Sequence, residues 1–485
     1  MKLTITVCLC LAVNSPLYAV SSLGQTNEEI ELPVLGNSSS GLFSLQQEYQ
    51  LGRAWLSAFR SQVKTVSDPL LQVYLEDLIY KLATHSELKD HRLDIVVVEN
   101  PSINAFAVPG GVVGVHNGLL LHAETEAQLA SVLSHELAHL SQRHFARSVE
   151  TQQRNAIPNM AGLLAGIILA ATQGGDAGLA AIMASRAANL QSQLRYSRLH
   201  EQEADRKGMQ TMVRADFDPN AGAAMFEKMQ QASRFAGNRP PEFLLSHPVT
   251  ESRISDNRNR ARQHQRKIYT DNLEYQLMRA RVELHFSDNN KDAINRFRAK
   301  IKRTSHYPEA DQYGLVLALI NNRELNEASQ RLKPLRAAAP NSIPYIIAEA
   351  QLLIADKKYE KAISLLTNML SITPNNHPLT MTLAQTLLKA NEPHSAEAIL
   401  KKHSLHKPTD PSVWYLLAET HGLAGNIVGV HQARAEYFVL NGVLDKAEKQ
   451  LGYALPLVKQ DHLTTARIKE RILQIKQLKE ALEKL

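Results

Sequence analysis

The chain has 485 residues, a formal net charge of +6, and 44% hydrophobic and 21% charged residues. Such a length predicts two or three domains, and the composition is typical of a soluble globular protein. Because Lys and Arg are scattered among Asp and Glu, the small positive excess indicates no nucleic-acid-binding surface.

The N-terminus is typical of a signal peptide at residues 1–19. Lys2 carries a positive charge, residues 3–13 are almost wholly apolar, and Ala19 ends a small-residue cleavage site. The alternative is an uncleaved membrane anchor, for which the apolar run is short. Both cysteines of the chain lie within this segment. The mature protein is therefore expected to use neither a disulfide nor a thiol nucleophile.

A polar leader, residues 20–42, precedes two predicted helices. Residues 44–62 repeat apolar side chains on one face, and a second helix begins at Asp68 before a proline. Residues 93–98 alternate and are β-branched, which predicts a strand. Residues 104–115 contain a Pro-Gly-Gly turn and predict a hairpin or a pair of edge strands.

The next segments are expected to be mainly helical. One long helix is predicted at 124–145 and another at 192–215. Residues 157–190 are rich in Ala, Gly, Leu and Ile. Their apolar run is too short to favour a membrane span, so a buried helix or an active-site lid is expected. The proline-bearing residues 236–252 predict a loop.

A repeat occupies residues 270–485. Prolines and two series of alanines recur every 34 residues, at Pro340, Pro374 and Pro408, at Ala328, Ala362 and Ala396, and at Ala350, Ala384 and Ala418. This period is that of tetratricopeptide repeats, in which small residues let paired helices approach. We expect an all-α solenoid of four to six helix pairs, which binds proteins on its concave face.

The segment Ser134 to His139 carries the strongest chemical signal. His135 and His139 stand four residues apart on a predicted helix, so both can reach one zinc ion. Glu136 lies between them and can take a proton from water. The alternative is a solvated histidine pair on an ordinary helix, against which the apolar neighbours argue.

A hydrolytic zinc site needs a third protein ligand, for which Glu201 is the candidate. Asp205 shares its helix face and can bind the outer nitrogen of a histidine ligand. Glu203 points about 160° away on an ideal helix and is interpreted as surface charge. An acidic helix start without a ligand role is the alternative.

These motifs together resemble the gluzincin metallopeptidases related to CAAX prenyl proteases and bacterial membrane heat-shock proteases. Besides residues 135–139 and 201–205, residues 104–111 resemble the substrate-strand motif of that group, and His247 and Arg253 resemble its downstream motif. With a signal peptide and a repeat domain, almost the whole mature chain is similar to the periplasmic β-barrel assembly-enhancing proteases of Gram-negative bacteria. The multiple membrane spans of other members are lacking here, which implies a soluble form.

The resemblance implies a mainly α, zincin-like peptidase domain with a small β-sheet at residues 43–265, holding one Zn²⁺ per chain. It also implies a zinc metalloendopeptidase with chaperone activity in the periplasm, soluble after signal-peptide cleavage or peripheral at the outer membrane. Expected partners are unfolded or misassembled outer-membrane β-barrel proteins, and the barrel assembly machinery through the repeats. The alternative is a repeat-based chaperone or assembly scaffold with a latent metal site. A purely structural site would have no use for Glu136.

An extended substrate is expected to pair with the strand that carries four residues of the substrate motif, Asn104, Ala105, Phe106 and Ala107. A plain hairpin is the alternative. Arg253 or His247 is a candidate to assist the oxyanion. Arg143 and His144 are interpreted as a surface pair at a helix end.

His247 has three interpretations. It is an ordinary loop histidine, a hydrogen-bond donor to the oxyanion, or a fourth zinc ligand that fills the position water needs. We predict the third, with loop movement opening the site.

Overall fold

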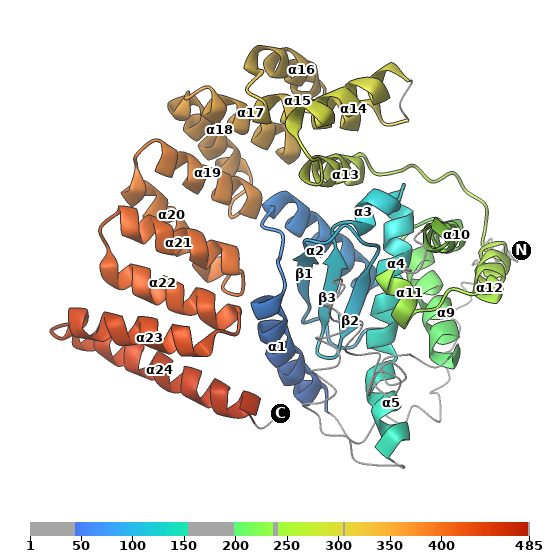
Figure 1. Cartoon of the computed structure of the whole chain (residues 1–485), viewed down its shortest axis with the longest axis horizontal. Helices are drawn as coiled ribbons and strands as arrows, with labels where there is room; N and C mark the ends of the chain where they lie inside the picture. Colours follow the sequence, from blue (N-terminus) through green and yellow to red (C-terminus); the bar gives the residue numbers. More distant parts are fainter. Residues whose placement is uncertain (1–43, 154–197, 236–240, 304–305, 484–485) are drawn as a thin grey trace, which may run out of the picture. The chain divides into compact units, whose positions relative to one another are not determined.

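The computed structural model describes residues 44–153, 198–235, 241–303 and 306–483. Within these ranges the chain is mainly helical with one three-stranded sheet, so the predicted fold class is confirmed (Figure 1). The predicted signal peptide, the polar leader and the apolar segment 157–190 lie outside the described residues. Among the helices that are described, none has both the length and the apolarity needed to cross a bilayer.

Two helices begin the described chain, as predicted. α1 (Leu45–Gln62) starts at Ser44, whose side chain accepts from the amide of Gln47 in a capping box. α2 (Pro69–Thr84) starts at Asp68, whose carboxylate caps the helix ahead of a proline in the first turn.

The sheet has the order β1-β3-β2. β1 (Asp94–Val98) runs parallel to β3 (Val112–His116), and β2 (Ala105–Val108) pairs antiparallel with β3. The predicted strand and hairpin are therefore present, and β2 is an edge strand. Gly110 in the turn has φ +82°, and a Cβ there would lie 2.1 Å from the carbonyl oxygen of Glu48.

The prediction of one continuous helix at 124–145 is wrong about where the helix ends. After the short α3 (Leu119–His122), α4 (Glu126–Ser141) ends early, and α5 (His144–Gln153) begins after a break. Arg143 adopts the left-handed conformation with φ 51°, which turns the chain out of the first helix.

Among the described residues of the peptidase part, the next helices are α9 (Arg198–Arg214), α10 (Asn220–Phe235), α11 (Glu242–Ser246) and α12 (Glu251–Ala261). The loop predicted at 236–252 therefore contains the short helix α11, which the prolines around it concealed. α9 packs along α4. Their close approach is at Gly208, where a Cβ would lie 3.1 Å from the backbone nitrogen of His135.

The repeat region consists of paired helices, as the 34-residue period predicts (Figure 1). Between residues 273 and 483 they are α13 (Leu273–His285), α14 (Asn290–Lys302), α15 (Pro308–Asn321), α16 (Leu325–Ala338), α17 (Ile343–Ala355), α18 (Tyr359–Ile372), α19 (His377–Lys389), α20 (Pro393–His406), α21 (Pro411–Leu423), α22 (Ile427–Leu440), α23 (Leu444–Ala454) and α24 (His462–Glu483), with the 3₁₀ turn η1 (Leu455–Val458) before the last. All six recurring alanines are buried between helices.

The first repeat helix packs directly on the peptidase part. Tyr275 of α13 is fully buried, and its hydroxyl donates to the carbonyl oxygen of Ala123 at 2.6 Å. Arg281 pairs with the capping residue Asp68 at 2.7 Å. Apolar residues from α2 to α20 consequently form one continuous core.

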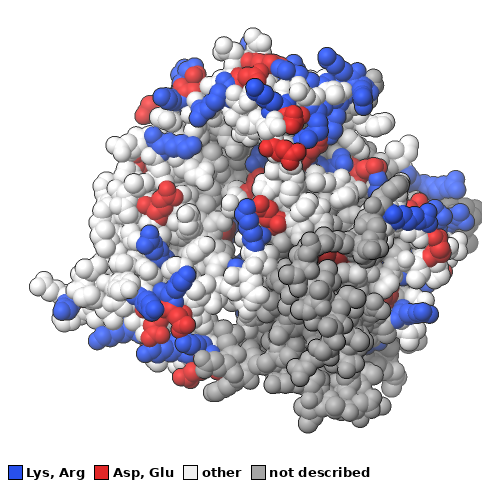
Figure 2. Space-filling model, in the orientation of Figure 1, with Lys and Arg blue, Asp and Glu red and all other residues white. Residues whose placement is uncertain are grey.

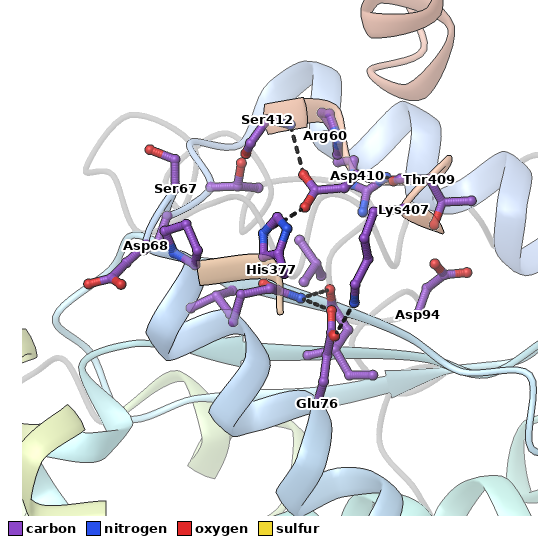
Figure 3. A pocket seen from close by; sticks show the side chains of 18 of the residues that line it. Arg60, Ser67, Asp68, Glu76, Asp94, His377, Lys407, Thr409, Asp410 and Ser412 are labelled. Carbon is purple, nitrogen blue, oxygen red and sulfur yellow. Dashed lines mark hydrogen bonds and ion pairs between the residues drawn. The ribbon is translucent and has the colours of Figure 1, made fainter. Parts of the chain in front are cut away.

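The repeats approach the peptidase part a second time at a pocket. Residues of α2, β1 and the repeat segment 407–412 line this pocket (Figure 3). Lys407 pairs with Glu76 at 2.7 Å, and Nε2 of His377 lies 3.3 Å from Asp410. Elsewhere on the visible face, Figure 2 shows Lys and Arg interspersed with Asp and Glu. Opposite charges therefore neutralise one another locally.

Candidate metal centre

Four side chains converge at the end of α4. His135 and His139 project from α4, Glu201 from α9, and His247 from the end of α11. One ligand atom from each lies within 4.8 Å of all the others, and all four residues are buried. The structure thus brings together every residue that the sequence predicted as a metal ligand.

The spacing of these atoms fits a tetrahedral ion. Nε2 of His135 lies 3.1 Å from Nε2 of His139 and 3.5 Å from Oε2 of Glu201. Nδ1 of His247 lies 3.4 Å from Nε2 of His135 and 3.0 Å from Oε1 of Glu201. Ligands about 2.1 Å from a tetrahedral metal stand about 3.4 Å apart. Three imidazoles and a carboxylate are also donors that zinc accepts.

Asp205 and Arg253 support these ligands from behind. Oδ1 of Asp205 lies 3.0 Å from Nδ1 of His135, the nitrogen that faces away from the other ligands. Arg253 donates two hydrogen bonds of 2.7 Å to Asp205 and pairs with Oε2 of Glu201 at 2.8 Å. It also donates to the carbonyl oxygen of Pro248 at 2.8 Å and lies over the ring of Phe226. These contacts favour orientation of the ligands over donation to an oxyanion.

The charges are arranged to keep Glu201 ionised. Burial alone would raise the pKa of Glu201, but His247, His135 and His139 around it hold this pKa well below its usual value. Burial similarly opposes the ionisation of Asp205, and its bonds to Arg253 and His135 lower the pKa of that carboxyl. Both carboxylates are therefore available as anions at neutral pH.

Glu136 lies beside the ligands and is 1% exposed. One carboxylate oxygen is 3.5 Å from Nε2 of His247. Burial raises the pKa of Glu136, while His247, His135 and the backbone amide of Ala107 act in the opposite direction. A buried carboxyl with a raised pKa accepts a proton more readily than an exposed one.

His247 occupies a defined position rather than a loose loop. It ends α11, its amide donates to the carbonyl oxygen of Phe243 at 2.8 Å, and the two rings stack 4.7 Å apart. Oε2 of Glu242, at the other end of the helix, accepts from the side chain of Asn104 at 3.2 Å. The histidine is thereby connected to the edge strand.

The comparisons with known proteins agree with this geometry. Residues 69–261 match peptidase family M48, and residues 353–420 match a tetratricopeptide repeat. The beta-barrel assembly-enhancing protease of Escherichia coli O157:H7 is 34% identical over 93% of this chain and 92% of its own length. The chain belongs to this protease family. It is a metalloendopeptidase with a repeat domain.

Two other relatives extend the comparison. The putative beta-barrel assembly-enhancing protease of Vibrio cholerae is 35% identical over 96% of both chains. The mitochondrial metalloendopeptidase OMA1 of Schizosaccharomyces pombe is 32% identical over 38% of this chain and half of its own. OMA1 therefore resembles only part of this chain.

In this M48 peptidase the predicted substrate strand, β2, lies against the metal centre. The amide of His116 donates to the carbonyl oxygen of Asn104, so hydrogen-bonded pairs with β3 recur at every second residue, at Phe106 and Val108. The amide of Ala107, between them, points to the open edge. The same amide is within reach of Glu136. Phe106 turns its ring onto Trp55 and Phe59, with ring centroids 5.6 and 5.4 Å away. Its side chain therefore packs against the core, and its backbone pairs with β3, so Phe106 itself offers nothing to the open edge.

One interpretation made from the sequence is wrong, and another is incomplete. His144 is not a surface residue: it is fully buried, and its Nδ1 lies 2.7 Å from Nδ1 of His139. Glu203 is partly exposed, as a surface charge would be, but it also pairs with Arg147 at 2.8 Å and approaches His144 at 3.1 Å. Arg143 pairs with Glu48 at 2.8 Å. The break between α4 and α5, which the sequence did not predict, places His144 inside the protein and next to Glu203.

Proposed function

We propose that this chain is a zinc endopeptidase of the periplasm that cleaves unfolded or misassembled outer-membrane β-barrel proteins. The observation that carries the proposal is the buried set of three imidazoles and one carboxylate with Glu136 beside it. We assign one Zn²⁺ per chain to His135, His139 and Glu201, with His247 as the fourth ligand at rest.

Zinc, when bound, supplies the Lewis acidity that activates water and polarises the peptide carbonyl. Glu136 takes a proton from the attacking water and delivers it to the leaving amine, so that one carboxylate serves both steps. The open edge of β2 pairs with an extended substrate and lays its scissile bond across the site. Asp205 and Arg253 hold the ligands in place throughout.

The location and substrates follow from the wider chain. The N-terminal segment 1–19 has the features of a signal peptide, and the relatives across nearly the whole length are named for β-barrel assembly. We assign residues 43–265 to catalysis and residues 270–485 to recruitment of client proteins and of the barrel assembly machinery. Paired-helix repeats are suited to that second task because they present an extended surface.

A second candidate function is supported by the closed site. All four ligand residues are at most 4% exposed, and His247 takes the fourth position, which the attacking water would need. The protein would then act mainly as a chaperone or assembly scaffold through its repeats, with its peptidase latent until α11 moves.

Casein cleavage by wild type and by Glu136→Gln, measured together with zinc content, tests the proposal. We expect the variant to keep zinc and to lose at least about 100-fold in cleavage rate, because the base is removed and no ligand is. Glu126→Gln is a matched control, since it changes a glutamate in the first turn of the same helix. Near wild-type cleavage by Glu136→Gln would exclude the proposed mechanism. Absence of cleavage by wild type, with zinc bound, would favour the scaffold.

A further inference from the structure

His144 reaches the metal centre because of the break after α4. On a continuing helix, a residue five positions after His139 would project about 140° away from it. The left-handed Arg143 instead starts α5 at His144 and returns the imidazole to His139. The two rings lie 4.8 Å apart, with their Nδ1 atoms 2.7 Å from each other.

The contacts continue from His144 to a carboxylate. Nε2 of His144 lies 3.1 Å from Oε2 of Glu203, and the same oxygen accepts from Arg147 at 2.8 Å. Glu203 comes from α9, two residues after Glu201. The path therefore connects one metal ligand, through a buried ring, to a carboxylate fixed by an arginine.

The other histidine on α4, His135, is supported in the same way, but without an intervening histidine. His135 meets Asp205 directly, and Asp205 is fixed by Arg253. Each of the two histidine ligands on α4 is thus connected, directly or through His144, to a carboxylate that pairs with an arginine. A histidine ligand commonly donates its outer N–H to such a partner, which sets its tautomer and orientation.

One arrangement of protons satisfies the contacts of His144 with His139 and Glu203. If Nε2 of His139 is to bind a metal, its proton must be on Nδ1, which then donates to Nδ1 of His144. His144 accepts at that nitrogen only with its own proton on Nε2, which then donates to Glu203. The carboxylate at the end of the path thereby selects the tautomer of a residue that it does not touch.

We infer that His144 and Glu203 are positioning residues that hold His139 in the tautomer and orientation that metal binding needs. This inference rests on the proposed zinc site. It assigns to both residues a part in the reaction without contact to the substrate.

Zinc affinity of the full-length protein, measured by competition with a chelator, tests the inference. We expect His144→Phe and Glu203→Ala to weaken zinc binding about 10- to 100-fold. Glu203→Gln, whose amide oxygen can still accept from His144, should fall between these variants and wild type. Glu87→Ala is the control, because Glu87 also pairs with a residue of α9, Lys207, and is similarly exposed.

Thermal unfolding with and without zinc separates positioning from folding. A merely structural role would lower both melting temperatures equally, whereas positioning reduces the stabilisation that zinc adds. If His144→Phe does not fold, the partly exposed Glu203 still gives the answer. Zinc affinity within about twofold of wild type in Glu203→Ala would overturn the inference and leave the proposed function standing. Wild type that binds no zinc would overturn both.

Discussion

At the scale of single residues, we propose that His247 closes the site at rest. It is 2% exposed and contacts both Glu201 and Glu136. We predict that His247→Ala retains zinc, because three ligands remain, and cleaves casein faster than wild type, because water gains the fourth position. The measurements are the initial cleavage rate and the zinc content of the purified variant.

The competing role for His247 gives the opposite result. If the imidazole donates to the oxyanion, His247→Ala retains zinc and loses activity, by about 100-fold or more. Unchanged activity would contradict both roles. A control for disturbance of α11 is Leu245→Ala, because Leu245 lies on the same short helix and is 37% exposed.

Much of the centre could be predicted because its spacing is local. His135 and His139 share a helix face four residues apart, and Glu201 and Asp205 repeat that spacing on a second helix. His144 could not be assigned in this way, since its position depends on the left-handed conformation of Arg143. The sequence does contain a third histidine, His144, five residues after His139. Its role can be recognised only when the break between α4 and α5 is known.

At the scale of elements, the edge strand β2 is the expected docking site for substrate. We predict that Ala107→Pro, which removes an outward amide that serves substrate pairing and also approaches Glu136, lowers kcat/KM for casein about tenfold and leaves zinc content unchanged. Ala107→Val keeps the amide and is the matched control. Equal activity of the two variants would show that substrate does not pair with this edge.

We expect a histidine pair between α19 and α20 to make the stability of the repeats depend on pH. His377 and His403 stack, with Nδ1 and Nε2 2.8 Å apart, and burial, followed by the charge of His377, lowers the pKa of His403 to about 4. A group whose folded pKa is lowered stabilises the fold above its unfolded pKa of about 6.5, and this contribution is lost as pH falls towards 4.

We therefore predict that His403→Phe, which keeps the stacked ring, loses less stability than wild type between pH 7 and pH 5. After allowance for partial solvent screening, the difference should be roughly 1 kcal/mol in the free energy of unfolding by urea. His394→Gln, at an exposed position of α20, should behave as wild type. The same pH response in His403→Phe would refute the assignment.

At the scale of the whole molecule, α13 is the first helix of the repeat region and also packs on the peptidase part. Tyr275, Gln276 and Arg279 donate to carbonyl oxygens of residues 120–124, just before the metal-binding helix. We predict that a protein truncated after residue 289 melts at least about 5 °C higher than one truncated after residue 269. Both should bind zinc, because every proposed ligand precedes residue 269. Equal melting temperatures would show that α13 does not stabilise the peptidase part.

The architecture was predictable where the sequence repeats. The 34-residue period of proline and alanine predicts the paired helices, and hydrophobic periodicity predicts α1, α2 and the sheet. The contacts of α13 with residues 120–124 and of Lys407 with Glu76 join residues more than 150 positions apart. No local pattern encodes such pairs, so the packing of repeats on the peptidase part could not be foreseen.

The central claim is that His135, His139, Glu201 and His247 together hold one zinc ion at rest. X-ray absorption spectroscopy of the zinc-loaded, substrate-free protein tests it most directly, because it counts imidazole and oxygen ligands. We predict three imidazoles and one carboxylate in wild type. In His247→Ala we predict two imidazoles, with oxygen in place of the third. A wild-type spectrum with only two imidazoles, unchanged in His247→Ala, would contradict the claim.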